Sequence, residues 1–99
     1  MKYVISWEIR ANATEESRAR SLQVFGKWTP SEKATFKEFV ERVDGQGGFA
    51  VVETDDPAAI SRDTALFSPF FDFSVHPVLE IADGTAIDRE MVELLASMH

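Results

Sequence analysis

The chain has 99 residues, enough for one domain, and its 44% hydrophobic content with eight Phe, two Trp and one Tyr excludes the low-hydrophobicity signature of disorder. The absence of cysteine excludes a disulfide framework, a thiolate metal site and a thiol nucleophile. The formal charge of −7 lies almost wholly after Asp44, where two basic residues stand against ten acidic ones, so we expect no nucleic-acid partner.

The first ten residues, MKYVISWEIR, alternate between apolar and polar positions, which predicts a strand. One face carries Tyr3, Ile5, Trp7 and Ile9, and the other carries Lys2, Val4, Ser6, Glu8 and Arg10. Glu8 and Arg10 interrupt the apolar run that a signal peptide needs, and no later segment is apolar enough to span a bilayer. We therefore expect a cytoplasmic protein without a membrane partner.

A helix is predicted from Thr14, which can cap its N-terminus, with Ala19, Leu22 and Phe25 at helical spacing until Gly26 stops the run. The sequence KWTPSEK then forms a connector, because a proline restricts the residue before it to an extended conformation.

The stretch TFKEFVERV is ambiguous, because its apolar residues match the i, i+3, i+4, i+7 spacing of a helix. The turn sequence DGQGG and the strand GFAVVETD follow it, however, and that strand needs an antiparallel partner. We therefore predict a strand over residues 35–43. Regular alternation then places Phe36 and Val40 on one face and Phe39 and Val43 on the other.

A second helix is predicted in DDPAAISRDTALFSP, with Asp56 as N-cap, Pro57 at the first helical position and an end at Ser68. The stretch DFSVHPVLEI is the last strand, and Pro77 predicts an edge position because proline cannot donate to a sheet. A terminal helix capped by Thr85 carries an apolar stripe that we expect to cover the sheet or a partner subunit.

This order, βαββαβ plus a terminal helix, predicts an α+β ferredoxin-like sandwich in a single domain over residues 1–99. The last strand lies beside the first in a four-stranded antiparallel sheet, with helices on one face. The other face is left open, with Val4, Val52 and Phe36 or Phe39 adding apolar area. An open face on so short a chain predicts a homodimer packed sheet to sheet.

The segments KWTPSEKATFKEFVERVDGQGGFAVVETDDP and FSPFFDFSVHPVLEI resemble an uncharacterised bacterial group, the domain-of-unknown-function family 3303. The likeness runs from about Met1 to about Ile81 and includes the opening strand, the Lys-Trp-Thr-Pro connector, the Asp-Gly-x-Gly-Gly-Phe turn and the Phe-Ser-Pro step. The resemblance implies a dimeric α/β-barrel relative and a strand at residues 35–43. It implies no reaction and no catalytic residues.

His76 is the candidate catalytic residue, because the ordinary pKa of a histidine suits proton transfer and its face of the last strand is polar. Glu8 is the candidate carboxylate that orients it. The expected substrate-binding residues are Ser6, Asp72, Ser74 and Trp28. A structural, hydrogen-bonded role for His76 and a core position for Trp28 remain the alternatives.

We expect neither a metal nor a cofactor. His76 and His99 lack the paired spacing of metal ligands, and DGQGG lacks the lysine and hydroxyl residue of a phosphate loop. Two functions stay open. The first is a small-molecule binding barrel, with or without cofactor-free acid/base catalysis on a small organic substrate. The second is a non-catalytic dimerisation or regulatory module.

Overall fold

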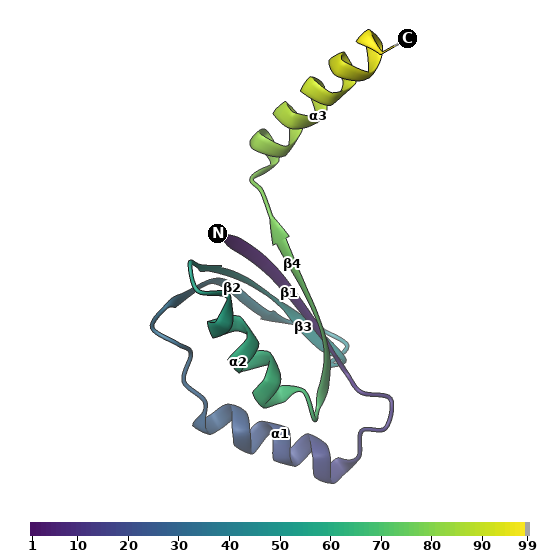
Figure 1. The fold of residues 1–99 in the computed structure, drawn as a ribbon. Helices are drawn as coiled ribbons and strands as arrows, with labels where there is room; N and C mark the ends of the chain where they lie inside the picture. The colour runs from purple at the N-terminus through teal and green to yellow at the C-terminus, as the bar shows by residue number, and fades with distance from the viewer. Residues whose placement is uncertain (99) are drawn as a thin grey trace.

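The computed structural model describes residues 1–98 as seven elements in the order β-α-β-β-α-β-α (Figure 1). They are β1 (Lys2–Ile9), α1 (Glu15–Lys27), β2 (Ala34–Glu41), β3 (Gly47–Thr54), α2 (Pro57–Phe67), β4 (Phe71–Val78) and α3 (Ile81–Ser97). This order confirms the predicted succession of elements, including the strand at β2.

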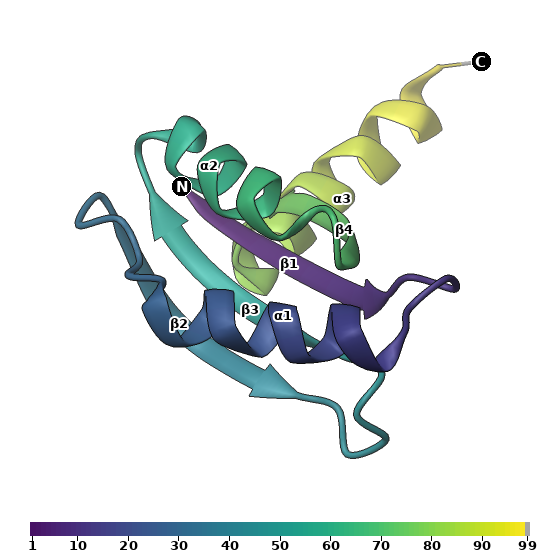
Figure 2. The same cartoon turned by 90° about the horizontal axis from the view of Figure 1, so that it is seen from below.

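The four strands form one antiparallel sheet in the order β2-β3-β1-β4. The last strand therefore lies beside the first, as predicted, and β4 with Pro77 is an edge strand. Helices α1 and α2 lie on the same face of the sheet (Figure 2). We call this the helix face and the opposite one the open face. The arrangement confirms the α+β ferredoxin-like fold.

The buried core is small and lies on the helix face. It consists of Ile5, Ala50, Val52 and Ile60, with partly buried aromatic residues packed around it. Val52 is only 1% exposed. It lies opposite Tyr3 on the neighbouring strand, and both residues are on the helix face of the sheet. The expectation that Val52 lies on the open face is therefore wrong. Val4, Val51 and Phe49 lie there instead, since they alternate with the core residues along β1 and β3.

A β-bulge in β2 corrects the predicted faces of that strand. The pairing register shifts between Phe36, opposite Val52, and Glu38, opposite Val51, which leaves Lys37 as the extra residue. Phe36 and Phe39 consequently share the helix face, with ring centroids 5.1 Å apart, rather than lying on opposite faces. The bulge explains why a strand shows the i, i+3 spacing of a helix.

The turn between β2 and β3 uses its glycines for two reasons. Gly45 has a φ of 71°, a left-handed conformation that favours glycine. Gly47 and Gly48 are buried, and a Cβ atom on either would collide with the backbone of a neighbouring strand. At Gly48 it would also strike the indole of Trp7, so this glycine leaves room for the ring over β3.

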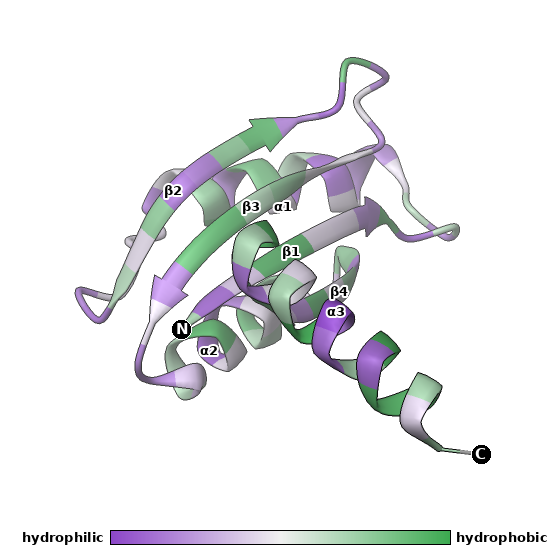
Figure 3. Ribbon diagram, turned by 90° about the horizontal axis from the view of Figure 1, so that it is seen from above, coloured by the Kyte–Doolittle hydropathy of each residue, from purple (hydrophilic) through white to green (hydrophobic). Residues whose placement is uncertain are grey.

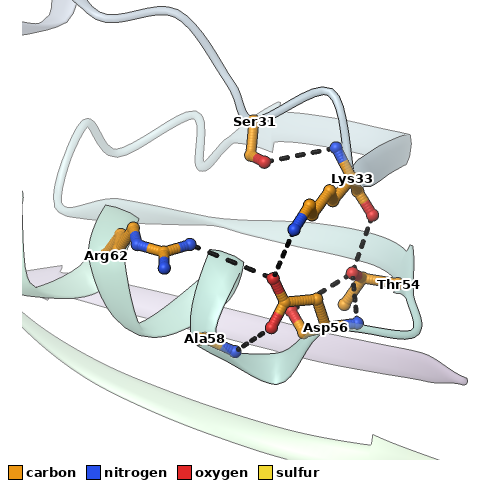
Figure 4. Close-up of polar contacts among 6 residues, drawn as sticks. All are labelled: Ser31, Lys33, Thr54, Asp56, Ala58 and Arg62. Carbon is orange, nitrogen blue, oxygen red and sulfur yellow. Dashed lines mark hydrogen bonds and ion pairs between the residues drawn. The ribbon is translucent and has the colours of Figure 1, made fainter.

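A polar network fixes the start of α2 beside the start of β2 (Figure 4). Asp56 caps the helix, accepting from the Ala58 backbone N–H at 3.2 Å, with Pro57 in the first turn as predicted. The buried hydroxyl of Thr54 donates to the Lys33 carbonyl at 2.7 Å and accepts from the Asp56 N–H at 3.0 Å. One threonine thus joins the connector, β3 and α2.

Helix α1 begins as predicted at Thr14, where Thr14 and Ser17 form a reciprocal capping box. It continues through Gly26 to Lys27, one residue beyond the predicted stop. None of its residues is fully buried, and Leu22 is 71% exposed. Helix α1 therefore lies over the sheet without closing against it.

Helix α3 begins at Ile81, four residues before the predicted cap at Thr85, and Glu80 makes no side-chain capping bond to it. The helix rises from the end of β4 on the open-face side and stands away from the sheet (Figures 1 and 3). None of its residues is buried. Of the two alternatives expected for this helix, the one in which it covers the sheet of its own chain is therefore wrong, and its apolar stripe lies exposed.

Candidate functional site

A cavity lies between the helix face of the sheet and the two helices above it. Its volume is about 100 Å³, or about 630 Å³ when the open space at its mouth is counted as well. We call it the sheet–helix cavity. Its lining residues are Ile5, Trp7, Phe25, Trp28, Ala34, Phe36, Phe39, Ala50, Val52, Ile60, Asp63, Thr64, Phe67, Phe71 and Phe73. Its wall is almost wholly apolar.

Trp28 is at the centre of the aromatic wall. Its indole makes edge contacts with Phe36, Phe39 and Phe67, at centroid distances of 5.8, 6.0 and 5.7 Å. Phe25 lies against the same indole at 5.8 Å. These rings come from α1, the connector, β2 and α2, so four segments of chain meet around one side chain. Edge contacts of this kind stabilise a defined arrangement of rings.

A hydrogen bond fixes the orientation of Trp28. Its Nε1 donates to Asp63 Oδ1 at 2.9 Å, across from the connector to α2. Asp63 makes no ion pair with any other residue in the range 1–98. Thr64, the other polar lining residue on α2, donates to the Ser61 carbonyl at 3.2 Å. The cavity can therefore bury an apolar molecule but offers it few polar atoms.

A second cavity lies under the N-terminal half of α1, near the turn between β2 and β3. We call it the hairpin cavity, and its empty volume is about 620 Å³, open mouth included. Its lining residues are Ile9, Ala13, Ser17, Arg18, Ser21, Leu22, Glu41, Gly45, Gly47, Phe70 and Phe71. Phe71 lines both cavities, so they adjoin at this side chain. The hairpin cavity is the more polar of the two.

The residues predicted as a polar row do lie together on the open face. The register places Ser6 opposite Ser74, Glu8 opposite Asp72 and Val4 opposite His76. His76 is exposed and makes no hydrogen bond or ion pair with another residue of the range 1–98. It does not line the sheet–helix cavity.

Glu8 and His76 do not lie close to each other. Its partner across the strand pair is Asp72, four residues before His76, which separates the two positions by about 13 Å along the strand. Glu8 instead pairs with Arg42 at 3.0 Å, and Asp72 pairs with Arg10 at 3.3 Å. Both predicted carboxylates therefore already have cationic partners. The geometry of the open face does not assemble a histidine–carboxylate pair.

Ion pairs lie at both ends of the open face. One end carries Glu8–Arg42 and Arg10–Asp72, and the other carries Lys2–Glu80 and Lys37–Glu53. A hydrogen bond to Glu80 raises the pKa of Lys2, and the bond from Arg42 to Asp44 raises the pKa of that arginine. The Gln46 backbone N–H, with help from Arg42, lowers the pKa of Asp44.

Trp28 is the predicted site residue that lines a cavity, on the face of the sheet opposite His76. His99 lies outside the described residues. Within residues 1–98, no group of three or more potential metal ligands comes together, and no helix is long and apolar enough to cross a membrane.

Sequence reasoning did not single out Arg18, Asp63 or Phe71. Arg18 and Leu22 are four residues apart and Phe25 follows three later, so one stripe of α1 places all three at the two cavities. The spacing of these three residues could have been recognised in the sequence. The bond between Trp28 and Asp63 had no local signal, because 35 residues separate the two side chains.

Comparison with family models matches residues 1–92 to a domain of unknown function, DUF3303. A search of curated proteins finds no match. The family match covers every strand of the sheet and both helices of the helix face, together with the first part of α3.

Proposed function

The chain belongs to the DUF3303 family, whose description assigns no activity, and we propose from its own residues that it binds a small apolar organic molecule in the sheet–helix cavity. The observation that carries this proposal is the wall of aromatic side chains around an unfilled space between the sheet and the helices, about 100 Å³ in volume and open to solvent at its mouth. Ordinary cores fill such a space with their own side chains, since protein interiors pack at crystal-like density.

The incomplete burial of α1 supports the same function. Phe25 lines the cavity and is nevertheless half exposed, and no residue of α1 is buried. A ligand in the cavity would remove these rings from water and contribute roughly 25 cal/mol for each Å² of apolar surface that it covers. Ligand binding would therefore add apolar burial to a protein whose own core is small.

Tryptophan fluorescence gives a direct test, because Trp7 and Trp28 are the two tryptophans and both line the cavity. We expect ω-phenyloctanol to change the emission of the protein in a saturable titration. Thr64→Phe, which adds a ring to the cavity wall, should weaken binding about tenfold or more. Ser61→Phe, on the exposed side of the same helix, should bind as the unsubstituted protein does.

The proposal is overturned if the folded protein shows no saturable response to this probe at millimolar concentration. Equal affinities of the Thr64→Phe and Ser61→Phe variants would also overturn it, because binding would then not occur in the cavity. Amide spectra of each variant establish that it is folded before the titration.

We propose as a second function that two copies associate through the open face. Apolar residues lie between the charged ends of that face, where Phe49 on β3 is 47% exposed and Val40, opposite it on β2, is 49% exposed. Exposed apolar area between polar ends is typical of surfaces that meet another protein. In this arrangement Ser6, Ser74 and His76 hydrate or border the contact between copies.

Helix α3 supports association on the same side of the sheet. A helix of 17 residues without tertiary contacts is only marginally stable in water, and α3 has neither a side-chain cap nor a buried residue in its own chain. Its exposed apolar residues are Ile81, Ile87, Met91, Val92, Leu94, Leu95 and Met98. A second copy would give this stripe a partner.

Sedimentation equilibrium tests the association. We expect the chain to sediment as a dimer at micromolar concentration and Phe49→Ser to shift it toward the monomer. Leu66→Ser is the matched control, because Leu66 is also 47% exposed but lies on α2. Monomeric behaviour of the unsubstituted protein at high micromolar concentration, or an equal effect of the two substitutions, would contradict the second function.

A further inference from the structure

The two cavities under α1 differ in chemistry, and the difference bears on the ligand. The sheet–helix cavity is aromatic, whereas the hairpin cavity carries the charged side chains of Arg18 and Glu41 and the hydroxyls of Ser17 and Ser21. Both hydroxyls donate to backbone carbonyls of their own helix, Ser17 to Thr14 and Ser21 to Arg18. The side chains of this cavity that remain available to bind a ligand through charge are therefore Arg18 and Glu41.

Arg18 has no partner among the residues that the structure describes, 1–98. Its guanidinium makes neither an ion pair nor a hydrogen bond with another residue of the range 1–98, and it makes no pair with Glu41 although both line the same cavity. The basic residues on or directly after β1 and β2, by contrast, are paired: Lys2, Arg10, Lys37 and Arg42 each lie beside a carboxylate. Arg18 is thus an exposed cation at the rim of the cavity with its donors available to an incoming group.

The cavities are arranged end to end along α1. Phe71 borders both, and one stripe of the helix contributes Arg18 and Leu22 to one and Phe25 to the other. Arg18 precedes Phe25 by seven residues, which is about 10 Å of helix. A ligand that lies under α1 therefore meets aromatic rings at one end and a guanidinium at the other.

We propose that the ligand is an elongated amphipathic acid, with an apolar body in the sheet–helix cavity and a carboxylate that pairs with Arg18 in the hairpin cavity. Arginine binds a carboxylate with two parallel hydrogen bonds, which adds orientation to charge attraction. This inference rests on the proposed binding function and extends it by naming the class of ligand.

The test compares three probes that share a phenyl ring. ω-Phenyloctanoate can span both cavities, ω-phenyloctanol is its uncharged counterpart, and phenylbutanoate is too short to reach Arg18 from the aromatic wall. We expect the long acid to bind about tenfold more tightly than the alcohol, and the short acid to bind no better than the alcohol. Charge-assisted hydrogen bonds of this kind justify a preference of that size.

Substitutions assign the preference to one side chain. Arg18→Gln should abolish the preference for the long acid and leave the alcohol unaffected. Arg20→Gln is the matched control, because Arg20 lies on the same helix, lines neither cavity and bonds to Gln23. Glu41→Gln should strengthen binding of the long acid, because it removes a like charge from the hairpin cavity.

The outcomes separate this inference from the function on which it depends. If none of the three probes binds, the proposed binding function fails and the ligand class fails with it. If the alcohol and the long acid bind equally well, or if Arg18→Gln keeps the preference for the acid, the amphipathic acid is excluded while binding in the sheet–helix cavity stands.

Discussion

Thr54 shows how one buried polar side chain can organise a fold with a small core. It is only 5% exposed, and its hydroxyl bonds to Lys33 on the connector and to Asp56 at the start of α2. Both of these groups are backbone atoms that would otherwise be unpaired near the protein interior. A buried donor or acceptor without a partner costs more than the hydrogen bond itself contributes.

We predict that Thr54→Val destabilises the protein by about 1–3 kcal/mol, because it keeps the shape of the side chain and leaves two backbone groups without partners. Urea denaturation followed by circular dichroism measures the change. Thr35→Val on the exposed part of β2 is the control and should change stability by no more than about 0.5 kcal/mol. Equal midpoints for the two variants would contradict this role of Thr54.

Two glycines give opposite predictions for the same substitution. Gly48→Ala should destabilise the protein by about 2–3 kcal/mol, because a Cβ there meets the Val40 carbonyl and the ring of Trp7. Gly26→Ala should stabilise it by about 1 kcal/mol, because Gly26 lies inside α1 with open space around it. Thermal denaturation of both variants checks the signs. Destabilisation by Gly26→Ala would mean that α1 needs the flexibility of glycine.

At the scale of the element, the strand β2 shows what sequence reasoning captured and what it lacked. The turn at Gly45 and the strand after it were enough to predict a hairpin against the helical spacing of the apolar residues. The bulge at Lys37 was not predictable, because it depends on the pairing with β3 rather than on any local residue preference. The element was therefore right, while the prediction that Phe36 and Phe39 lie on opposite faces was wrong.

Helix α3 illustrates a different limit. Its apolar stripe correctly predicted a helix, but the cap at Thr85 was wrong because the helix begins at Ile81 without any side-chain cap. Amphipathic spacing tells which side of a helix avoids water and does not tell which surface covers it. The cavities have the same limit: the residues that line them were visible in the sequence, but their meeting depends on how α1 sits over the sheet.

The hairpin of β2 and β3 carries a pH-dependent contribution. The pKa of Asp44 is lowered in the folded state by the Gln46 N–H and by Arg42, so the carboxylate stabilises the fold above its ordinary pKa near 3.8. That contribution disappears as the pH falls through the lowered folded-state pKa. Asp44→Asn keeps an oxygen for the Gln46 N–H and removes the charge.

We predict that Asp44→Asn lowers the urea midpoint at pH 7 and that the difference from the unsubstituted protein shrinks at pH 3 and below. Asp88→Asn on α3 serves as control, because Asp88 makes no ion pair within residues 1–98. Urea titrations at both pH values decide the matter. A difference that is independent of pH would show that the Asp44 charge does not contribute.

At the scale of the whole molecule, the chain is long and narrow. Its principal extents are 60 × 30 × 21 Å and its radius of gyration is 17.7 Å, against about 13 Å for a compact chain of this size. The difference comes from α3, which stands clear of the sheet (Figure 1). The other six elements, the four strands with α1 and α2, form the body from which α3 extends.

We predict that a chain ending at Glu80 has nearly the thermal stability of the full chain at concentrations where both are monomeric, because α3 buries nothing in its own chain. The same truncation should weaken self-association at higher concentration. Calorimetry and sedimentation on both chains measure the two effects. A large loss of monomer stability on truncation would show that α3 folds back onto the body in solution.

The ion pairs at the ends of the open face have a consequence for how association responds to salt. Each of these pairs is closed within one chain, so the face presents few free charges to attract another copy. Each copy also carries a formal charge of −7, which repels the other at long range. Added electrolyte screens that repulsion over a Debye length of about 10 Å at 0.1 M. Association through this face should therefore tighten as ionic strength rises, opposite to the behaviour of interfaces held by charge attraction.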